Sequence, residues 1–174
     1  MDRKHVIEAA WNWINMTIPV ISSTFASFSR MCKNLGAETL GHLFIDEAGQ
    51  ALPQAAVGAI YRSRHVMVVG DPLQIKPVLT LDSNTLYMLG EHFGVTEKYL
   101  SASASAQILA DAASQYGFYR KQDKAEDSWV GIPLWVHRRC RYPMFTISNM
   151  ISYDGFMVQG MEKYGKAEIG RAHV

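Results

Sequence analysis

The sequence predicts an α/β fold built on a parallel β-sheet. Two apolar runs of strand length, HLFID at residues 42–46 and HVMVVGD at residues 65–71, flank a segment with helical spacing of apolar residues, QALPQAAVGAIY at residues 50–61. This order of strand, helix and strand favours a right-handed crossover between parallel strands. Because both runs are apolar at consecutive positions, we expect a sheet that helices cover on both faces.

The segment before these strands predicts two helices. Residues 6–14 have apolar side chains at helical spacing, and residues 17–23 follow as an extended stretch. Ser23 or Thr24 is suited to cap a second helix, and Gly36 is placed to end it. The expected apolar face of this second helix consists of Phe25, Phe28, Met31, Cys32 and Leu35.

The segment after the strands predicts shorter elements. Helices are expected at residues 86–93 and at residues 105–117, where the second ends at its glycine. Residues 119–128, YRKQDKAEDS, are typical of a solvated loop, and residues 133–138, PLWVHR, of a further strand. Pro143 is suited to open a last helix. The residues that this helix is expected to bury are Met144, Ile147 and Ile151.

Composition restricts the class of protein. A chain of 174 residues, 48% hydrophobic and 19% charged, has enough apolar side chains for one core, so we expect a single compact unit. The net charge of +1 gives no global attraction to nucleic acid and leaves any such contact to a local basic patch. Cys32 and Cys140 lack metal-ligand spacing, so we expect buried free thiols. Without a signal peptide or a run of roughly 18 apolar residues, we expect a soluble, cytoplasmic protein with no membrane partner.

Acidic residues follow both predicted strands. Asp46 and Glu47 end the first strand, and Asp71 ends the second, with Gln74 three residues further on. In an open α/β sheet, ligands bind at the carboxyl ends of the strands. A short apolar run followed by Asp-Glu is the Walker B pattern, in which the Asp holds Mg²⁺ and the Glu polarises the water that attacks a γ-phosphate. The alternative is two ordinary core strands that end in turn residues, since Gly-Asp-Pro is common in turns.

Three segments in one order carry a resemblance to a known family. DEAGQ at residues 46–50, GDPLQIKPV at residues 70–78 and VHRRCRYPMFTISNMISYDG at residues 136–155 resemble motifs II, III and IV of superfamily-1 helicases of the Upf1-like type. Residues 105–117 resemble the helix that follows motif III in that family. The resemblance implies a parallel-sheet, RecA-like P-loop NTPase domain that couples ATP hydrolysis to movement along single-stranded DNA or RNA.

The resemblance implies a role for each matching residue. Asp46 would hold Mg²⁺, Glu47 would activate the attacking water, and Gln74 would sense the γ-phosphate of ATP. Asp71 would support this network. Arg139 would bind the γ-phosphate as a planar bidentate donor that neutralises developing charge. The alternative for the HRRCR run around Arg139 is a basic cluster that faces water.

Residues 20–31, VISSTFASFSRM, resemble the segment that contacts the nucleic-acid backbone in the same family. The hydroxyl groups of Ser22, Ser23 and Thr24 would bind a phosphate at the start of the helix. Simple capping of the helix is an equal alternative. No aromatic platform for base stacking is assigned from the sequence, because three aromatic side chains are expected in the core. These are Trp11, Trp13 and Phe25.

The sequence lacks the phosphate-binding loop GxxxxGK[ST] of a complete ATPase. Residues 36–43 lack its Lys and hydroxyl, and residues 160–167 have Ala167 where Mg²⁺ needs a hydroxyl. Because the Walker A strand and a second RecA-like domain are also absent, we expect residues 1–167 to be a partial N-terminal RecA-like domain, inactive without the remainder of its chain. Residues 168–174, EIGRAHV, resemble the in-frame translation of a sequencing-library adapter.

The expected loss of a central strand has a physical consequence. Neighbouring strands would have unpaired edges and exposed apolar faces, so we expect marginal stability or aggregation. Two other functions stay open for this fold. One is a regulatory or switch-type ATPase without unwinding activity, and the other is a non-catalytic interaction module.

Overall fold

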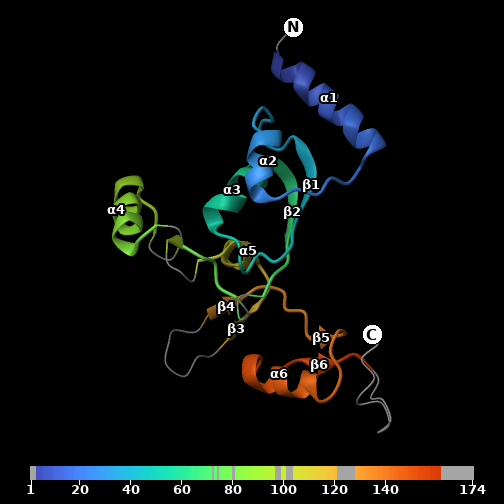
Figure 1. The fold of residues 1–174 in the computed structure, drawn as a ribbon, viewed down its shortest axis with the longest axis vertical. Coiled ribbons are helices and arrows are strands. Elements are labelled where there is room, and N and C mark those ends of the chain that lie inside the picture. The colour runs from blue at the N-terminus through green and yellow to red at the C-terminus, as the bar shows by residue number, and fades with distance from the viewer. Residues whose placement is uncertain are drawn as a thin grey trace, which may run out of the picture. The chain divides into compact units, whose positions relative to one another are not determined.

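The described part of the chain is a mixed α/β structure in two compact units. The computed structural model describes residues 3–71, 73, 75–79, 81–96, 99–100, 104–120 and 128–161. Unit 1 is Met1–Ala113 and unit 2 is Ser114–Val174. The elements of unit 1 are α1 (Arg3–Thr17), α2 (Phe25–Met31), β1 (Leu40–Ile45), α3 (Pro53–Tyr61), β2 (Ser63–Val68), α4 (Ser83–Phe93) and α5 (Ala106–Ala113) (Figure 1). Those of unit 2 are β3 (Phe118–Arg120), β4 (Ser128–Val130), β5 (Val136–His137), α6 (Met144–Ser152) and β6 (Val158–Gln159).

The sheet of unit 1 is a parallel pair of strands. In β1 and β2, Leu40 is opposite Ser63 and Ile45 is opposite Val68. Helix α3 connects the two strands and begins at Pro53, a residue whose fixed φ suits the first helical turn. The predicted order of strand, helix and parallel strand is therefore confirmed.

The core of unit 1 lies on one face of this pair. Helices α2 and α3 lie on that side (Figure 1), and the first residue of α5 joins them there. The side chains that point to this face alternate along the strands with those on the other face, as the two-residue period of a strand requires. The buried residues of the core are Ile45, Ala48, Ala56 and Ala106, and the partly buried ones are Phe25, Leu43, Ala51, Ile60 and Val68.

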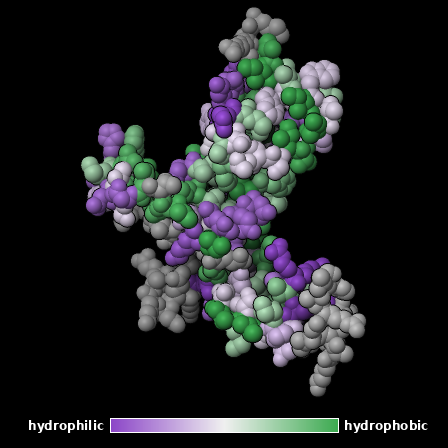
Figure 2. Space-filling model, in the orientation of Figure 1, coloured by the Kyte–Doolittle hydropathy of each residue, from purple (hydrophilic) through white to green (hydrophobic). Residues whose placement is uncertain are grey.

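The opposite face of the β1–β2 pair is open to solvent. Phe44 is 69% exposed, and Met67, His42 and His65 on the same face are exposed as well. The rings of His42 and His65 stack across the two strands with centroids 5.0 Å apart. Figure 2 shows apolar residues, coloured green, on the outside of the molecule. The prediction that helices cover both faces is wrong for the described residues, because α2, α3 and α5 all pack on one face.

Helix α2 ends earlier than the sequence predicts. Thr24 caps its start, since the backbone N–H of Ser27 donates to Thr24 Oγ1 at 3.3 Å. The helix stops at Met31 rather than at Gly36, because Cys32 leaves the helical conformation and its carbonyl oxygen accepts a hydrogen bond from Arg62 Nε at 3.0 Å. Cys32 nevertheless packs in the interior, as the apolar pattern predicts.

Helices α1 and α4 confirm the predicted helical segments with longer bounds. The side chain of Asp82 accepts a hydrogen bond from the backbone of Thr85 at 3.0 Å, so α4 starts at Ser83 instead of residue 86. In α1, Trp13 is 71% exposed, so the expectation of a core position for this side chain is wrong. None of the helices in the described part of the chain has the length and apolar character that crossing a membrane requires.

Helix α5 and the following segment also differ from the prediction. The helix ends at Ala113, and Gly117 instead precedes strand β3. A β-carbon at Gly117 would clash with the carbonyl oxygen of Val130 on the neighbouring strand, so only glycine permits this close approach. The predicted solvated loop at residues 119–128 begins and ends in the antiparallel pair β3–β4. Such short strands have too few residues to show a periodic pattern.

Helix α6 buries a different face from the predicted one. Met144, Ile147 and Ile151 are exposed, whereas Phe145 and Asn149 are buried. Asn149 is held inside by two hydrogen bonds with the backbone of Met157: its Nδ2 donates to the carbonyl oxygen at 2.9 Å, and its Oδ1 accepts from the N–H at 3.0 Å.

The remaining features of unit 2 concern its short strands and Cys140. The strand predicted at residues 133–138 is limited to β5, which pairs in parallel with β6. Cys140 is half-buried, and both cysteines of the chain are free thiols. The adapter-like residues 168–174 and Ala167 lie outside the described residues.

Candidate functional site

The carboxyl ends of β1 and β2 are joined by two backbone hydrogen bonds. The N–H of Val69 donates to the carbonyl oxygen of Ile45 at 2.8 Å, and the N–H of Ala48 donates to that of Val69 at 3.0 Å. The segments that start with Asp46 and Asp71 therefore leave the sheet at the same edge. This is the edge at which an open α/β sheet binds its ligands.

Gly70 allows the two segments to approach each other. A β-carbon at Gly70 would lie 2.5 Å from the backbone nitrogen of Gly49 and 2.7 Å from that of Ala48. Both distances are too short for real atoms, so a side chain at this position would push the segments apart. Glycine is thus required here by backbone contact, which the sequence pattern Gly-Asp-Pro alone does not reveal.

Glu47 has an unusual backbone conformation. Its φ of 52° lies in the left-handed region, which non-glycine residues seldom adopt. Local hydrogen bonds hold this turn: the N–H of Glu47 donates to Asp46 Oδ1 at 2.9 Å, and Gln50 Nε2 donates to Glu47 Oε2 at 3.2 Å. The side chains of Asp46 and Glu47 are both exposed, so their carboxylates are accessible to a ligand.

Asp71 shapes the segment after β2. Its Oδ1 accepts a hydrogen bond from the backbone N–H of Leu73 at 2.9 Å, the pattern of a turn formed by an aspartate side chain. The carboxylate is half-buried. This contact agrees with the alternative interpretation of Asp71 as a turn residue. Gln74 lies outside the described residues.

The start of α5 is attached to the segment that follows Glu47. The N–H of Ala106 donates to the carbonyl oxygen of Ala51 at 2.8 Å, and the N–H of Gln107 donates to that of Ala48 at 3.3 Å. The side chain of Gln107 donates through Nε2 to Asp111 at 3.2 Å. Its buried Oε1 accepts no hydrogen bond from the residues that the structure describes. No local pattern in the sequence points to Gln107, because it lies nearly sixty residues after the loop that it contacts.

The donor groups at this edge suit a hard cation. Mg²⁺ is bound in proteins through one or two carboxylates, and waters and substrate phosphates complete its shell. Asp46 and Asp71 offer carboxylate oxygens after neighbouring strands, which fits that requirement. Within the described ranges, no group of three His, Cys, Asp or Glu side chains is placed to bind a metal.

Arg139 belongs to unit 2, whereas Asp46 and Glu47 belong to unit 1. It follows strand β5 in a turn that His137 shapes, since the N–H of Cys140 donates to His137 Nε2 at 2.8 Å. The side chains of Arg138 and Arg139 are exposed and form no hydrogen bond or ion pair with another described residue.

The three candidate hydroxyl groups near α2 are exposed. Thr24 Oγ1 is the cap of α2, and Ser23 Oγ donates to the carbonyl oxygen of Thr24 at 3.0 Å. Thr24 therefore caps α2 through its hydroxyl oxygen, and its hydroxyl proton takes no part in this contact. Ser22 is likewise exposed.

Comparison with known proteins gave no match among family models, curated proteins or solved structures. The resemblance of the three motifs to a helicase family therefore stays a prediction from the sequence.

Proposed function

We propose that this chain forms part of a RecA-like P-loop ATPase domain of a superfamily-1 helicase, which couples Mg²⁺-dependent ATP hydrolysis to movement along single-stranded DNA or RNA. One observation carries most of the support. Asp46 and Glu47 directly follow β1, and Asp71 follows the parallel strand β2 at the same edge of the sheet. Carboxylates in this position meet the needs of phosphate chemistry.

The exposed carboxylates of Asp46 and Glu47 would have different roles. Asp46 would hold Mg²⁺, which when bound neutralises charge on the phosphates of ATP. Glu47 would accept a proton from the attacking water or orient it, a contribution of about 10²- to 10⁴-fold for a general base. Gln50 holds the carboxylate of Glu47 from one side through a hydrogen bond to Oε2.

Arg139 would supply positive charge to the γ-phosphate. A guanidinium group donates two parallel hydrogen bonds to phosphate oxygens, and such donors stabilise the charge that develops during transfer. The side chain is exposed, and the turn from His137 to Cys140 fixes the backbone from which it extends. Among the described residues, the only ion pair of an arginine in unit 2 is that of Arg120 with Asp154.

The phosphate-binding loop is not assigned to this chain. The 174 residues contain no GxxxxGK[ST] sequence in the required context. We therefore propose that the loop that binds the β- and γ-phosphates belongs to another segment of a longer protein that contains this chain. The second RecA-like domain would belong to that longer protein as well.

ATP hydrolysis by that longer protein tests the proposal, measured with and without single-stranded DNA or RNA. We expect stimulation by the nucleic acid and a loss of about 10²- to 10⁴-fold in turnover for Glu47→Gln. Glu38→Gln is the matched control, because Glu38 is an exposed glutamate with a φ of 54° outside the site. Equal turnover by Glu47→Gln and wild type would contradict the site.

The same assay separates the alternatives. Turnover that requires Glu47 but is not stimulated by nucleic acid would favour a switch-type ATPase. Absence of ATP turnover in the folded wild-type protein and in every variant would favour a non-catalytic interaction module. Asp46 and Asp71 would then be turn residues only.

A further inference from the structure

Two histidines face each other across the parallel strands of unit 1. His42 in β1 is opposite His65 in β2, and their ring centroids lie 5.0 Å apart with an angle of 28° between the ring planes. Both side chains are exposed on the open face of the pair. The next residues along the strands, Leu43 and Val66, are paired as well. The backbone that carries the two rings is therefore fixed by strand pairing rather than by a loop (Figure 1).

The imidazole nitrogens of this pair are not engaged by the protein. Neither His42 nor His65 forms a hydrogen bond or an ion pair with another described residue. Two other histidines differ in this respect, since His5 Nδ1 lies 3.8 Å from Glu8 Oε2 and His137 Nε2 accepts the N–H of Cys140. A neutral imidazole has one nitrogen with a free lone pair. Two such lone pairs are thus held close together on one surface.

The separation of the two rings suits a shared metal ion. The bond from Zn²⁺ to an imidazole nitrogen is about 2.0–2.1 Å long. With this bond and a ring radius of about 1.1 Å, a tetrahedral ion places the centroids of two bound imidazoles about 5 Å apart. The observed 5.0 Å agrees with that value. Because the ring planes are nearly parallel, a ring must turn about χ2 to direct its nitrogen at the ion, and χ2 of histidine is a broad torsion.

The surroundings of the pair favour a cation with a preference for nitrogen ligands. The neighbours of the histidines on this face are Phe44 and Met67, which carry no charge. Arg64 belongs to the other face by the two-residue period of the strand, and its Nε donates to the carbonyl oxygen of Glu38 at 2.8 Å. Imidazole suits Zn²⁺ and Cu²⁺, whereas Mg²⁺ and Ca²⁺ require oxygen ligands. The pair is therefore chemically distinct from the carboxylates after the strands.

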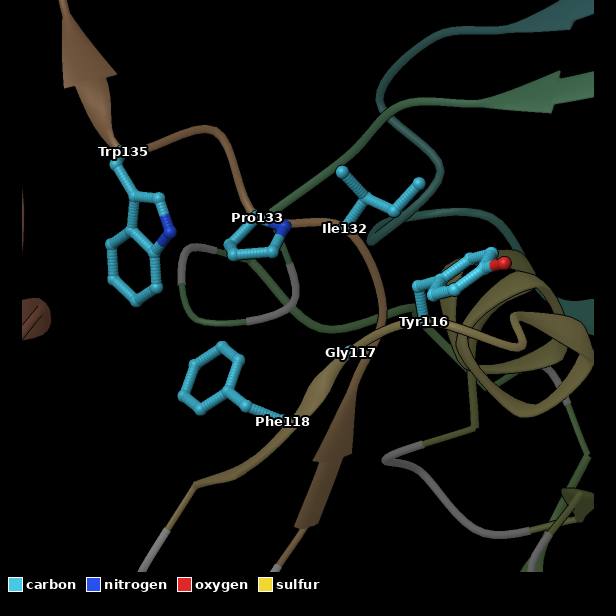
Figure 3. A pocket seen from close by; sticks show the side chains of 6 residues that line it. All are labelled: Tyr116, Gly117, Phe118, Ile132, Pro133 and Trp135. Carbon is cyan, nitrogen blue, oxygen red and sulfur yellow. The ribbon is translucent and has the colours of Figure 1, made fainter.

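Another exposed cluster of rings, in unit 2, has no comparable ligands. Figure 3 shows the side chains of Trp135, Pro133 and Phe118 around one part of an open groove, with Ile132 and Tyr116 near its other end. None of the residues that line this groove has an imidazole, thiol or carboxylate group. They are Tyr116, Gly117, Phe118, Ile132, Pro133 and Trp135.

We propose that His42 and His65 together bind one Zn²⁺ ion across β1 and β2, with water at its remaining positions. Cu²⁺ binds the same ligands more tightly, in the usual order of affinity for divalent transition ions. The ion joins two neighbouring strands on the face opposite the core, so it stabilises the folded form of unit 1. This site goes beyond the proposed function and needs neither ATP nor nucleic acid.

Titration calorimetry of Zn²⁺ into the full 174-residue chain tests the site. Excess Mg²⁺ in the buffer occupies carboxylates without competing for imidazole. We expect one tight zinc site per chain. His42→Gln and His65→Gln should each weaken it about 100-fold or more, because the remaining imidazole loses the gain that two linked ligands provide. His92→Gln is the matched control, since His92 is an exposed histidine of α4 whose ring contacts Phe93 rather than a second imidazole.

Urea unfolding gives a second measurement. Zn²⁺ should raise the unfolding midpoint of wild type and of His92→Gln, and a chelator should reverse the increase. Neither His42→Gln nor His65→Gln should respond to Zn²⁺. Without metal, all three variants should have the circular dichroism spectrum and the midpoint of wild type, because each substitution replaces an exposed side chain.

Four results would overturn the proposal. Wild-type affinity in both folded strand variants would place the ion elsewhere, and loss in only one of them would mean that the two imidazoles do not share it. An equal loss in His92→Gln would indicate general binding to surface histidines. One Zn²⁺ per two chains would make the histidines a bridge between copies. Because no ATP is present, failure of the hydrolysis assay would leave a zinc site that passes these tests unaffected.

Discussion

Gly70 lies so close to Gly49 that a β-carbon on Gly70 would be 2.5 Å from the backbone nitrogen of Gly49. This contact joins the segment after β2 to the segment after β1, and thus Asp71 to the turn that carries Asp46. The candidate site depends on backbone atoms as much as on its carboxylates.

Gly70→Ala should therefore destabilise unit 1. The methyl group has no space and must displace backbone, so we expect a loss of about 1–3 kcal/mol in the free energy of unfolding, the range for overpacking. Urea unfolding measures this change. Gly41→Ala is the control, because an added β-carbon in β1 meets no atom within 4 Å at this residue. Equal effects of the two substitutions would contradict the proposed contact.

Glu47→Gly should raise stability while it removes function. Glycine accepts a positive φ without strain, so relief of the conformation at Glu47 should add about 1 kcal/mol to the free energy of unfolding. Glu38→Gly should have a similar effect on stability, since Glu38 has a φ of 54°. In the longer protein, only Glu47→Gly should abolish hydrolysis. A stable Glu47→Gly variant with normal turnover would remove Glu47 from the catalytic residues.

Asn149→Ala should destabilise unit 2 by about 1–3 kcal/mol, because it leaves two backbone groups of Met157 without their hydrogen-bond partner. Thermal or denaturant unfolding, followed by circular dichroism, measures the loss. Ser148→Ala is the neighbouring control on the exposed side of α6 and should change stability little. A similar midpoint for both variants would show that water replaces the lost contacts at no cost.

Cys32 and Cys140 should differ in reactivity. Burial raises the pKa of the Cys32 thiol above its ordinary value, an effect that the positive charge of Arg62 partly opposes. Its side chain is 1% exposed, whereas Cys140 is half-buried. At mildly alkaline pH we expect a thiol reagent to label Cys140 first, and Cys32 slower by a factor of at least about ten, since it must wait for local opening. Mass spectrometry of the labelled peptides distinguishes the two; simultaneous labelling would mean that the α2 region opens readily.

The cap of α4 should depend on pH. Hydrogen bonds from Thr85 to the carboxylate of Asp82, first from its hydroxyl and then from its backbone, lower the pKa of Asp82. A lowered pKa in the folded state means that the contribution to stability is present above the ordinary carboxyl pKa. It is lost as the pH falls through the folded value.

Asp82→Asn provides the test of that dependence. Asparagine caps helices well but does not titrate in this range, so the variant should keep the helix at acidic pH where wild type frays. Asp82→Ala should weaken the start of α4 at every pH. Helical signal at 222 nm, followed from neutral to acidic pH, measures both, and parallel curves for wild type and Asp82→Asn would contradict the role of the carboxylate.

The strands β1 and β2 and the crossover helix α3 were predictable because each has a long, regular apolar pattern bounded by turn residues. For the same reason the positions of Asp46, Glu47 and Asp71 after these strands followed from the sequence. Their chemical roles still depend on the family resemblance.

Other features were not predictable because distant contacts decide them. Arg62 binds the carbonyl oxygen of Cys32 and ends α2 early, although Gly36 is a good local stop signal. The buried face of α6 is set by the hydrogen bonds between Asn149 and Met157, against the apolar pattern of the helix. The β3–β4 pair consists of two three-residue strands, which have no detectable period.

Helix α5 is hydrogen-bonded to the loop that carries Glu47. Its first two N–H groups hold the carbonyl oxygens of Ala48 and Ala51, and Ala106 packs in the same core as Ala48. A displacement of this loop would therefore disturb the hydrogen bonds that hold the start of α5. The last residue of the helix, Ala113, is also the last residue of unit 1, so one helix joins the loop of Glu47 to the point where the chain leaves unit 1.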